Sequence, residues 1–193
     1  MVSIHLFKGD TINRYLTAKK DVLTYKIGLE LSKDSVLDHD TAEKIIAEVR
    51  AENIVIDFER TSTNKIDGTN KVLSTDQMAY AVRFYVPFVG DWKILQLSSE
   101  TKSDTRYPVM LNDARDEIIY DVVIGEKSAE GIMQQFNSFR NFITSNLKGF
   151  NAPFLDHNHE LTKIVADLIQ KNLKVEQNQK DMLNFIGFPE RKS

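Results

Sequence analysis

The apolar residues of this chain change their spacing near residue 126, and that change constrains the fold more than any other feature. In residues 78–88 they occupy every second position: Met78, Tyr80, Val82, Phe84, Val86 and Phe88. This period is typical of a strand with one face toward a core. Beyond residue 128 apolar residues recur every three or four positions, as they do on one face of an α-helix. The sequence therefore predicts an α+β fold, with an N-terminal antiparallel sheet followed by C-terminal helices.

Other strand-length segments accompany residues 78–88. They are residues 3–8, 22–31, 54–58, 92–97, 107–111 and 117–124. Between Leu23 and Leu31 the alternation of apolar and polar residues is regular, so this segment is expected to be a half-buried strand. Short polar turns between the later segments favour hairpins, and hence an antiparallel meander.

Two short helices are expected within the sheet region. Asp10 can cap a helix that carries Ile12 and Leu16. Asp40 followed by Glu43 resembles a capping box, in which each side chain accepts a hydrogen bond from a free amide at the start of a helix. This pair predicts a helix over residues 41–52.

The C-terminal pattern predicts two helices that form an antiparallel hairpin. Gly149 suits the end of a first helix, and Pro153 suits the first turn of a second helix that runs toward Ile186. We accordingly expect a sheet domain over residues 1–126 and a helical hairpin over residues 127–189. The hairpin would pack on the sheet or on another subunit.

Composition excludes several classes of protein. The chain has 193 residues, no cysteine and a formal net charge of −3, so disulfides, thiolate nucleophiles and cysteine-ligated zinc are ruled out. A negative net charge argues against generic binding of nucleic acid, and no apolar run reaches the length of about 20 residues that crosses a bilayer. No glycine-rich phosphate loop is present, so no cofactor is expected. We expect a cytoplasmic protein of bacterial type.

One set of residues matches a metal-dependent nuclease. Asp57 lies on a predicted strand, and Glu100 and Lys102 follow another. In such hydrolases carboxylates hold the cation and a lysine assists the attacking water. The competing interpretation is that these are ordinary charges on the outer face of a sheet.

A second set could ligate a metal at the start of the last predicted helix. Asp156 lies one helical turn before Glu160, and Asp156 could also share an ion with His159. The competing interpretation is electrostatic, because acidic residues in the first turn of a helix oppose the positive end of its dipole.

The aromatic side chains of the predicted sheet suggest a third function. Tyr80, Phe84, Phe88 and Trp92 could line a ligand site, with the polar segment 61–77 as its lid. The chain would then be a small-ligand sensor. The same residues would equally serve as the core of the sheet.

Two short patterns carry a resemblance to a family. One is Val86–Pro87–Phe88 followed by Gly90–Asp91 and a further strand. The other is a tail with Asn158, Leu161, Ile164, Ile169, Asp181, Leu183 and Ile186–Gly187–Phe188–Pro189. The chain resembles accessory modules of uncharacterised bacterial proteins from defence-type operons, where the module sits beside or is fused to an effector. The resemblance implies an accessory or regulatory role and carries no catalytic residue.

The leading functional hypothesis is a non-catalytic interaction or assembly module. Apolar residues of the predicted hairpin would contact a protein partner or a second copy of the chain; they are Phe139, Ile143, Leu168, Leu173 and Val175. In residues 172–180 only Leu173 and Val175 are apolar. That segment is therefore expected either to project into solvent or to bind a partner.

Overall fold

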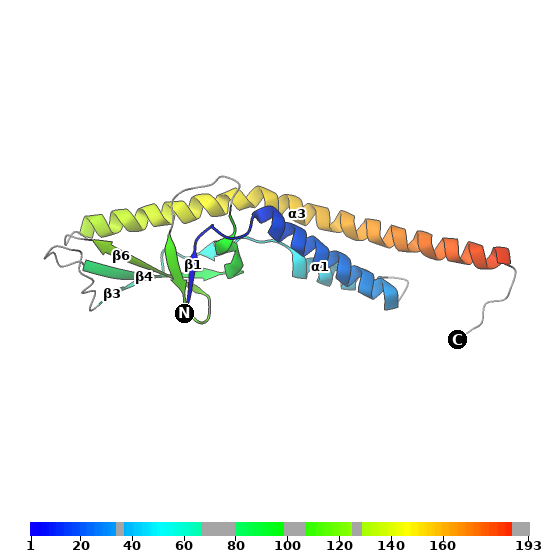
Figure 1. Ribbon diagram of the computed structural model, residues 1–193, viewed down its shortest axis with the longest axis horizontal. Coiled ribbons are helices and arrows are strands. Elements are labelled where there is room, and N and C mark those ends of the chain that lie inside the picture. The colour runs from blue at the N-terminus through cyan, green and yellow to red at the C-terminus, as the bar shows by residue number, and fades with distance from the viewer. Residues whose placement is uncertain (34–36, 67–79, 99–106, 125–128, 187–193) are drawn as a thin grey trace. The chain divides into compact units, whose positions relative to one another are not determined.

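The computed structural model describes residues 1–33, 37–66, 80–98, 107–124 and 129–186. These residues form a mixed α+β structure, with an antiparallel sheet in the N-terminal part and a long C-terminal helix (Figure 1). The α+β fold predicted from the change of period is confirmed.

Six strands form the sheet: β1 (Val2–His5), β2 (Val55–Ile56), β3 (Ser62–Lys65), β4 (Tyr80–Val89), β5 (Pro108–Leu111) and β6 (Glu117–Ile124). Their order is β1-β5-β6-β4-β2, and β3 also pairs with β4. Every pairing is antiparallel. The central pair β4 and β6 places Phe84 opposite Tyr120 and Val86 opposite Ile118.

The helices are α1 (Ile12–Lys33), α2 (His39–Val49), a 3₁₀ helix η1 (Trp92–Gln96) and α3 (Ala129–Ile186). The chain divides into two compact units. Unit 1 contains Met1–Tyr15 and Glu52–Pro153, and unit 2 contains Leu16–Ala51 and Phe154–Ser193. The boundaries of these units differ from those of the expected domains 1–126 and 127–189. Helices α1 and α3 each contribute residues to both units.

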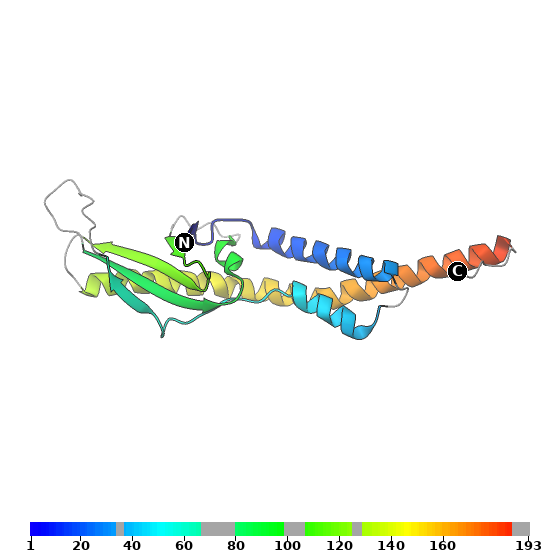
Figure 2. The ribbon, with the colours of Figure 1, turned by 90° about the horizontal axis from the view of Figure 1, so that it is seen from below.

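In unit 1 the first part of α3 lies along the sheet (Figure 2). Aromatic rings make the contact. Phe136 stacks on Phe84 with ring centroids 4.3 Å apart, and Phe139 stacks on Tyr120 at 4.1 Å. Because alternate residues of β4 and β6 point to the same face, the predicted period-two pattern supplies this aromatic layer. Stacked aromatic pairs add about 0.5–1.5 kcal/mol to the burial of their surface.

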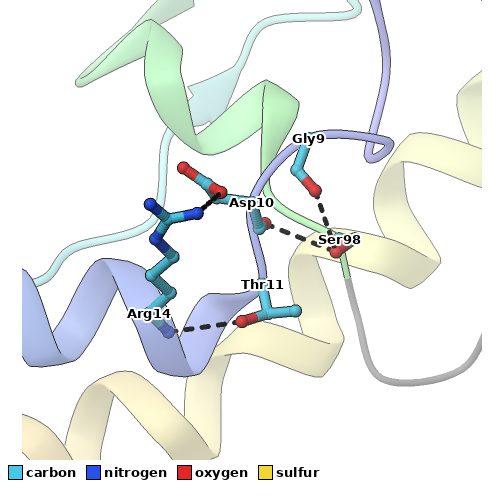
Figure 3. Close-up of polar contacts among 5 residues, drawn as sticks. All are labelled: Gly9, Asp10, Thr11, Arg14 and Ser98. Carbon is cyan, nitrogen blue, oxygen red and sulfur yellow. Dashed lines mark hydrogen bonds and ion pairs between the residues drawn. The ribbon is translucent and has the colours of Figure 1, made fainter.

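The segment that precedes α1 is hydrogen-bonded to Ser98, which follows η1 (Figure 3). The hydroxyl of Ser98 donates to the carbonyls of Gly9 and Asp10, each at 3.3 Å, and the amide of Ser98 donates to the carbonyl of Asp10 at 2.8 Å. The helix cap is Thr11 and not Asp10 as predicted, since Oγ1 of Thr11 accepts from the amide of Arg14 at 3.3 Å. Asp10 instead forms an ion pair with Arg14.

Unit 2 is built on an apolar cluster from three helices. α1 contributes Leu23 and Ile27, α3 contributes Leu161 and Val165, and α2 contributes Ala42, Ile45, Ile46 and Val49. The second predicted short helix is thus confirmed as α2. Its cap is Asp38 and not Asp40, since the side chain of Asp38 accepts from the amide of Thr41 at 2.9 Å. That hydrogen bond lowers the pKa of Asp38.

The predicted strand over residues 22–31 is wrong, because this segment is the middle of α1. Its alternating apolar residues include a row spaced by four, Leu23, Ile27 and Leu31, and that row packs into the cluster of unit 2. The remaining members face solvent; Tyr25 is 71% exposed. Residues spaced by four share one face of a helix, so a period-two run of this length also satisfies a helix.

The predicted strand over residues 92–97 is also wrong, because it forms η1. Gly90, with φ of +123°, turns the chain there, and Asp91 caps the helix by accepting from the amide of Lys93 at 3.0 Å. Ile94 and Leu95 are both buried. A strand would send these neighbours to opposite faces, whereas one tight helical turn buries both.

The predicted helical hairpin is wrong as well, because α3 is one continuous helix through Gly149 and Pro153. A proline inside a helix removes one hydrogen bond and costs about 3 kcal/mol. Phe150 and Phe154 on either side are buried, and each contributes about 1.5–3 kcal/mol by that burial. Burial on both sides of Pro153 thus offsets the cost of keeping it within the helix.

Candidate interaction surface

The helix α3 has an apolar stripe that is buried at first and then becomes exposed. Leu161 and Val165 lie in the cluster of unit 2, and Leu168 and Ile169 pack against its rim together with Leu31 of α1. Beyond Ile169 the helix continues to Ile186. We call residues 170–186 the distal segment of α3. Figures 1 and 2 show this part of α3 extending past the ends of α1 and α2.

Apolar side chains of the distal segment are exposed. The exposed fraction is 49% for Leu173, 53% for Val175, 64% for Met182 and 94% for Phe185. Side chains of this segment bond one another along the helix, for example from Nε2 of Gln177 to Oδ1 of Asp181 at 2.8 Å. Since burying a side chain of this size contributes about 1.5–3 kcal/mol, a partner that covered the segment would gain substantial stability from it.

No side chain of the distal segment that the structure describes is fully buried within the chain. Most of the stability of a helix in a protein comes from tertiary packing, and an isolated helix of about 15 residues is marginal in water. The first part of α3 has such packing in both units, whereas the side chains of residues 173–175 are exposed. Burial against another surface would therefore stabilise the helix and the contact together.

A second exposed apolar set lies on α1 in the same unit. Val22, Tyr25 and Leu29 are spaced by three and four residues, and Val22 and Leu29 are about half exposed. This spacing puts them on one face of the helix. The face turns away from the row Leu23 and Ile27 that fills the cluster.

The structure separates the predicted interaction residues into two groups. Phe139 and Ile143 are fully buried in unit 1, where Phe139 contacts Tyr120, Tyr107 and Phe136. Their apolar spacing is thus accounted for by packing within the chain. Leu168 is half-buried at the rim of the cluster of unit 2, and Leu173 and Val175 are exposed on the distal segment. Of the five predicted interaction residues, Leu168, Leu173 and Val175 are the ones with exposed surface.

Of the predicted nuclease residues, only Asp57 falls among those that the structure describes; Glu100 and Lys102 lie outside them. Asp57 follows β2, and its carboxylate accepts from the amide of Arg60 at 3.1 Å and pairs with Nε of Arg60 at 3.1 Å. These two contacts stabilise the turn that follows β2.

The predicted metal ligands Asp156, His159 and Glu160 lie on α3 within unit 2. Glu160 forms an ion pair with Lys20 of α1, and that contact lowers the pKa of Glu160. Among the described residues no group of three histidine or acidic side chains is arranged to hold a metal ion. In the structure Glu160 therefore links α3 to α1.

Sequence reasoning did not single out His157 and Asn158 as residues that join two helices. Nε2 of His157 lies 3.2 Å from the carbonyl oxygen of Val49, and Asn158 bonds both backbone groups of Ala51 at 2.9 Å. These contacts satisfy the backbone where α2 ends. Burial lowers the pKa of His157, and the positive charges of Lys20 and Lys19 act in the same direction. The signal in the sequence is a histidine and an amide side by side on a helix, which is too common to be specific.

Three of the aromatic residues predicted to line a ligand site, Phe84, Phe88 and Trp92, pack against other side chains of the protein. Phe84 and Phe88 are buried, and Phe84 lies under Phe136. Trp92 is half-buried, with the guanidinium of Arg115 4.6 Å from its ring centre. The predicted loop 61–77 contains β3, and its residues from 67 onward lie outside the described residues.

An open depression of about 360 Å³ lies beside α3 in unit 1. Its lining is Tyr107, Tyr120, Gln134, Gln135 and Ser138. Burial raises the pKa of Tyr120, and neighbouring Tyr107 adds to this, so the phenol stays protonated at neutral pH. The lining offers amide and hydroxyl groups without an activated nucleophile or a carboxylate. We therefore assign the depression no reaction.

Two further findings concern the helices and the comparison with known proteins. None of the described helices combines the length and the apolar character that crossing a membrane requires. Comparison of the chain with models of protein families, with curated proteins and with solved structures gives no significant match. The functional assignment consequently rests on the residues and contacts of this chain.

Proposed function

We propose that the protein is a non-catalytic interaction module, and that the distal segment of α3 is the surface through which it binds another protein chain. The observation that carries the proposal is the exposure of Val175, Met182 and their neighbours on a helix whose earlier turns are buried. Helical segments with an exposed apolar face commonly bind by laying that face against a partner.

The arrangement of the chain supports this role. Units 1 and 2 each have an apolar core of their own, so neither needs the distal segment for folding. A long helix that leaves a packed body and carries exposed apolar residues is a costly feature unless something covers them. The resemblance to accessory modules of bacterial defence-type operons implies the same kind of role, as a regulatory component beside an effector in the cytoplasm.

Replacement of Val175 by aspartate tests the proposal. A charge on the binding surface should remove the partner, because the contact would bury an unpaired carboxylate. Native mass spectrometry of the protein purified from its own cells measures the outcome. We expect the wild-type chain in a complex of defined stoichiometry and V175D as a free chain that is still folded.

Val55 on β2 provides the matched control, since it is also an exposed valine. V55D should leave the complex intact. A wild-type chain that is free under these conditions, or a complex that V175D leaves unchanged, would refute the distal segment as the binding surface.

A further inference from the structure

We infer that the distal segment of α3 binds a different protein, at an apolar groove whose rim carries carboxylates. This inference rests on the proposed function, because it names the chemistry of the surface that meets the same segment. Two features of the segment carry it. Three of its exposed apolar residues lie on one side of the helix, and beside them lie two lysines that form no ion pair with the described residues.

The apolar residues that would enter the groove are Val175, Met182 and Phe185, all exposed. At about 100° per residue they lie within about 80° of one another around the helix, over about three turns. An amphipathic helix of this length is enough to bind a groove, since a few anchors on one face supply the contact. Asn178 lies among them and is also exposed. The groove therefore has to offer its amide a hydrogen bond, because a buried amide without one is unfavourable.

Two lysines lie on the same side of the helix as these apolar residues. Lys171 comes one helical turn before Val175, and Lys174 comes one turn before Asn178. Both lysines are exposed, and neither forms an ion pair with any residue that the structure describes. The segment thus presents positive charge beside its apolar side.

The two acids of the segment are already hydrogen-bonded along the helix. Nδ2 of Asn172 donates to Glu176 at 3.4 Å, and Nε2 of Gln177 donates to Asp181 at 2.8 Å. The carboxylates therefore have donors within the helix, whereas the ammonium groups beside the apolar side are left for acceptors of a partner.

Elsewhere in unit 2, lysines at the border of a helix contact are paired with acids of the neighbouring helix. Lys20 of α1 pairs with Glu160 of α3, and Lys26 of α1 pairs with Glu48 of α2. A contact of the distal segment built in the same way needs carboxylates from the partner. A second copy of the segment would bring the same lysines, so a different, acidic surface is the complementary one.

The salt dependence of the complex tests the acidic rim. Salt screens ion pairs at a rim, because the Debye length falls from about 10 Å at 0.1 M to about 3 Å at 1 M, whereas it does not weaken apolar contacts. Native mass spectrometry of the wild-type complex in ammonium acetate over this range measures the fraction of free chain. We expect this fraction to rise with the salt concentration. A fraction that stays constant or falls would overturn the inference.

Charge reversal locates the contact on the helix. With the partner isolated from the wild-type complex, K171E and K174E should each raise the dissociation constant several-fold, because a carboxylate would then face the acidic rim. K180E is the matched control. Lys180 is equally exposed but points about 150° away from the apolar side, so K180E should bind as the wild type does. Lysine in place of a groove carboxylate of the partner should restore the binding of K171E.

The pattern of outcomes separates this inference from the proposed function. If V175D releases the partner while K171E and K174E bind as tightly as K180E, the distal segment is the binding surface and the acidic rim is refuted. A complex that contains only copies of this chain would likewise leave the proposed function standing and overturn the assignment to a different protein. If V175D leaves the complex intact, both proposals fail.

Discussion

At the scale of one residue, His157 is a titratable side chain that is buried between helices of unit 2. It is buried in unit 2, where Nε2 donates to the carbonyl of Val49, and Nδ1 has no hydrogen-bond partner among the described residues. A second proton on the ring would occupy Nδ1 in an apolar surrounding. Desolvation therefore disfavours the charged form and lowers the pKa of His157 below its ordinary value.

This lowered pKa predicts that the protein loses stability in mild acid. Below the unfolded pKa of about 6.5 the unfolded chain takes up a proton that the folded chain does not, so stability is present above that pH and is lost as pH falls toward the folded pKa. Chemical unfolding at a series of pH values measures the effect. H157Q keeps a donor near Nε2 and should lack this component, whereas H159Q at an exposed position should retain it. An identical pH dependence in H157Q and the wild type would contradict the account.

At the scale of the element, the continuity of α3 has a direct test in Gly149 and Pro153. No neighbouring atom lies within 4 Å of a Cβ added at Gly149, so alanine fits there. Within a helix G149A should stabilise the protein by about 0.5–1 kcal/mol, and P153A by about 1–3 kcal/mol. Urea unfolding measures both. If Gly149 instead ended a helix in the left-handed conformation, G149A would destabilise the protein, and that result would contradict a continuous α3.

The same two residues show why the hairpin could not be predicted correctly from the sequence. Glycine and proline four residues apart are the usual marks of a helix end and a helix start. Local preference favours a break there, and burial of Phe150 and Phe154 outweighs it. The strand predicted around Leu23 and Ile27 failed for a related reason, since the burial of a row spaced by four decided its structure.

The alternation of apolar and polar residues was enough to predict the two central strands. Strand β4 was predicted because its apolar residues alternate over its length, and β6 has the bounds expected for it, Glu117–Ile124. For the candidate surface, Leu173 and Val175 could be singled out because they are apolar residues in a polar stretch of helix. The burial of Phe139 and Ile143 could not, because apolar spacing is the same on a face that meets a sheet and on one that meets another chain.

At the scale of the whole molecule, the chain has two compact units with apolar cores and a distal segment for which we propose a partner. Unit 1 closes its sheet with aromatic residues of α3, and unit 2 closes three helices on an apolar cluster. The distal segment of α3 adds exposed apolar surface to unit 2. The central claim is that this segment is ordered by its partner.

Amide hydrogen exchange over residues 170–186 tests that claim most directly. A helical segment without tertiary packing opens at little cost and exchanges fast, whereas one held by a partner is protected. The account predicts slow exchange across these residues in the wild-type complex and fast exchange in V175D, with the amides of β4 and β6 equally protected in both. Equal exchange of the distal segment in the two proteins would contradict it.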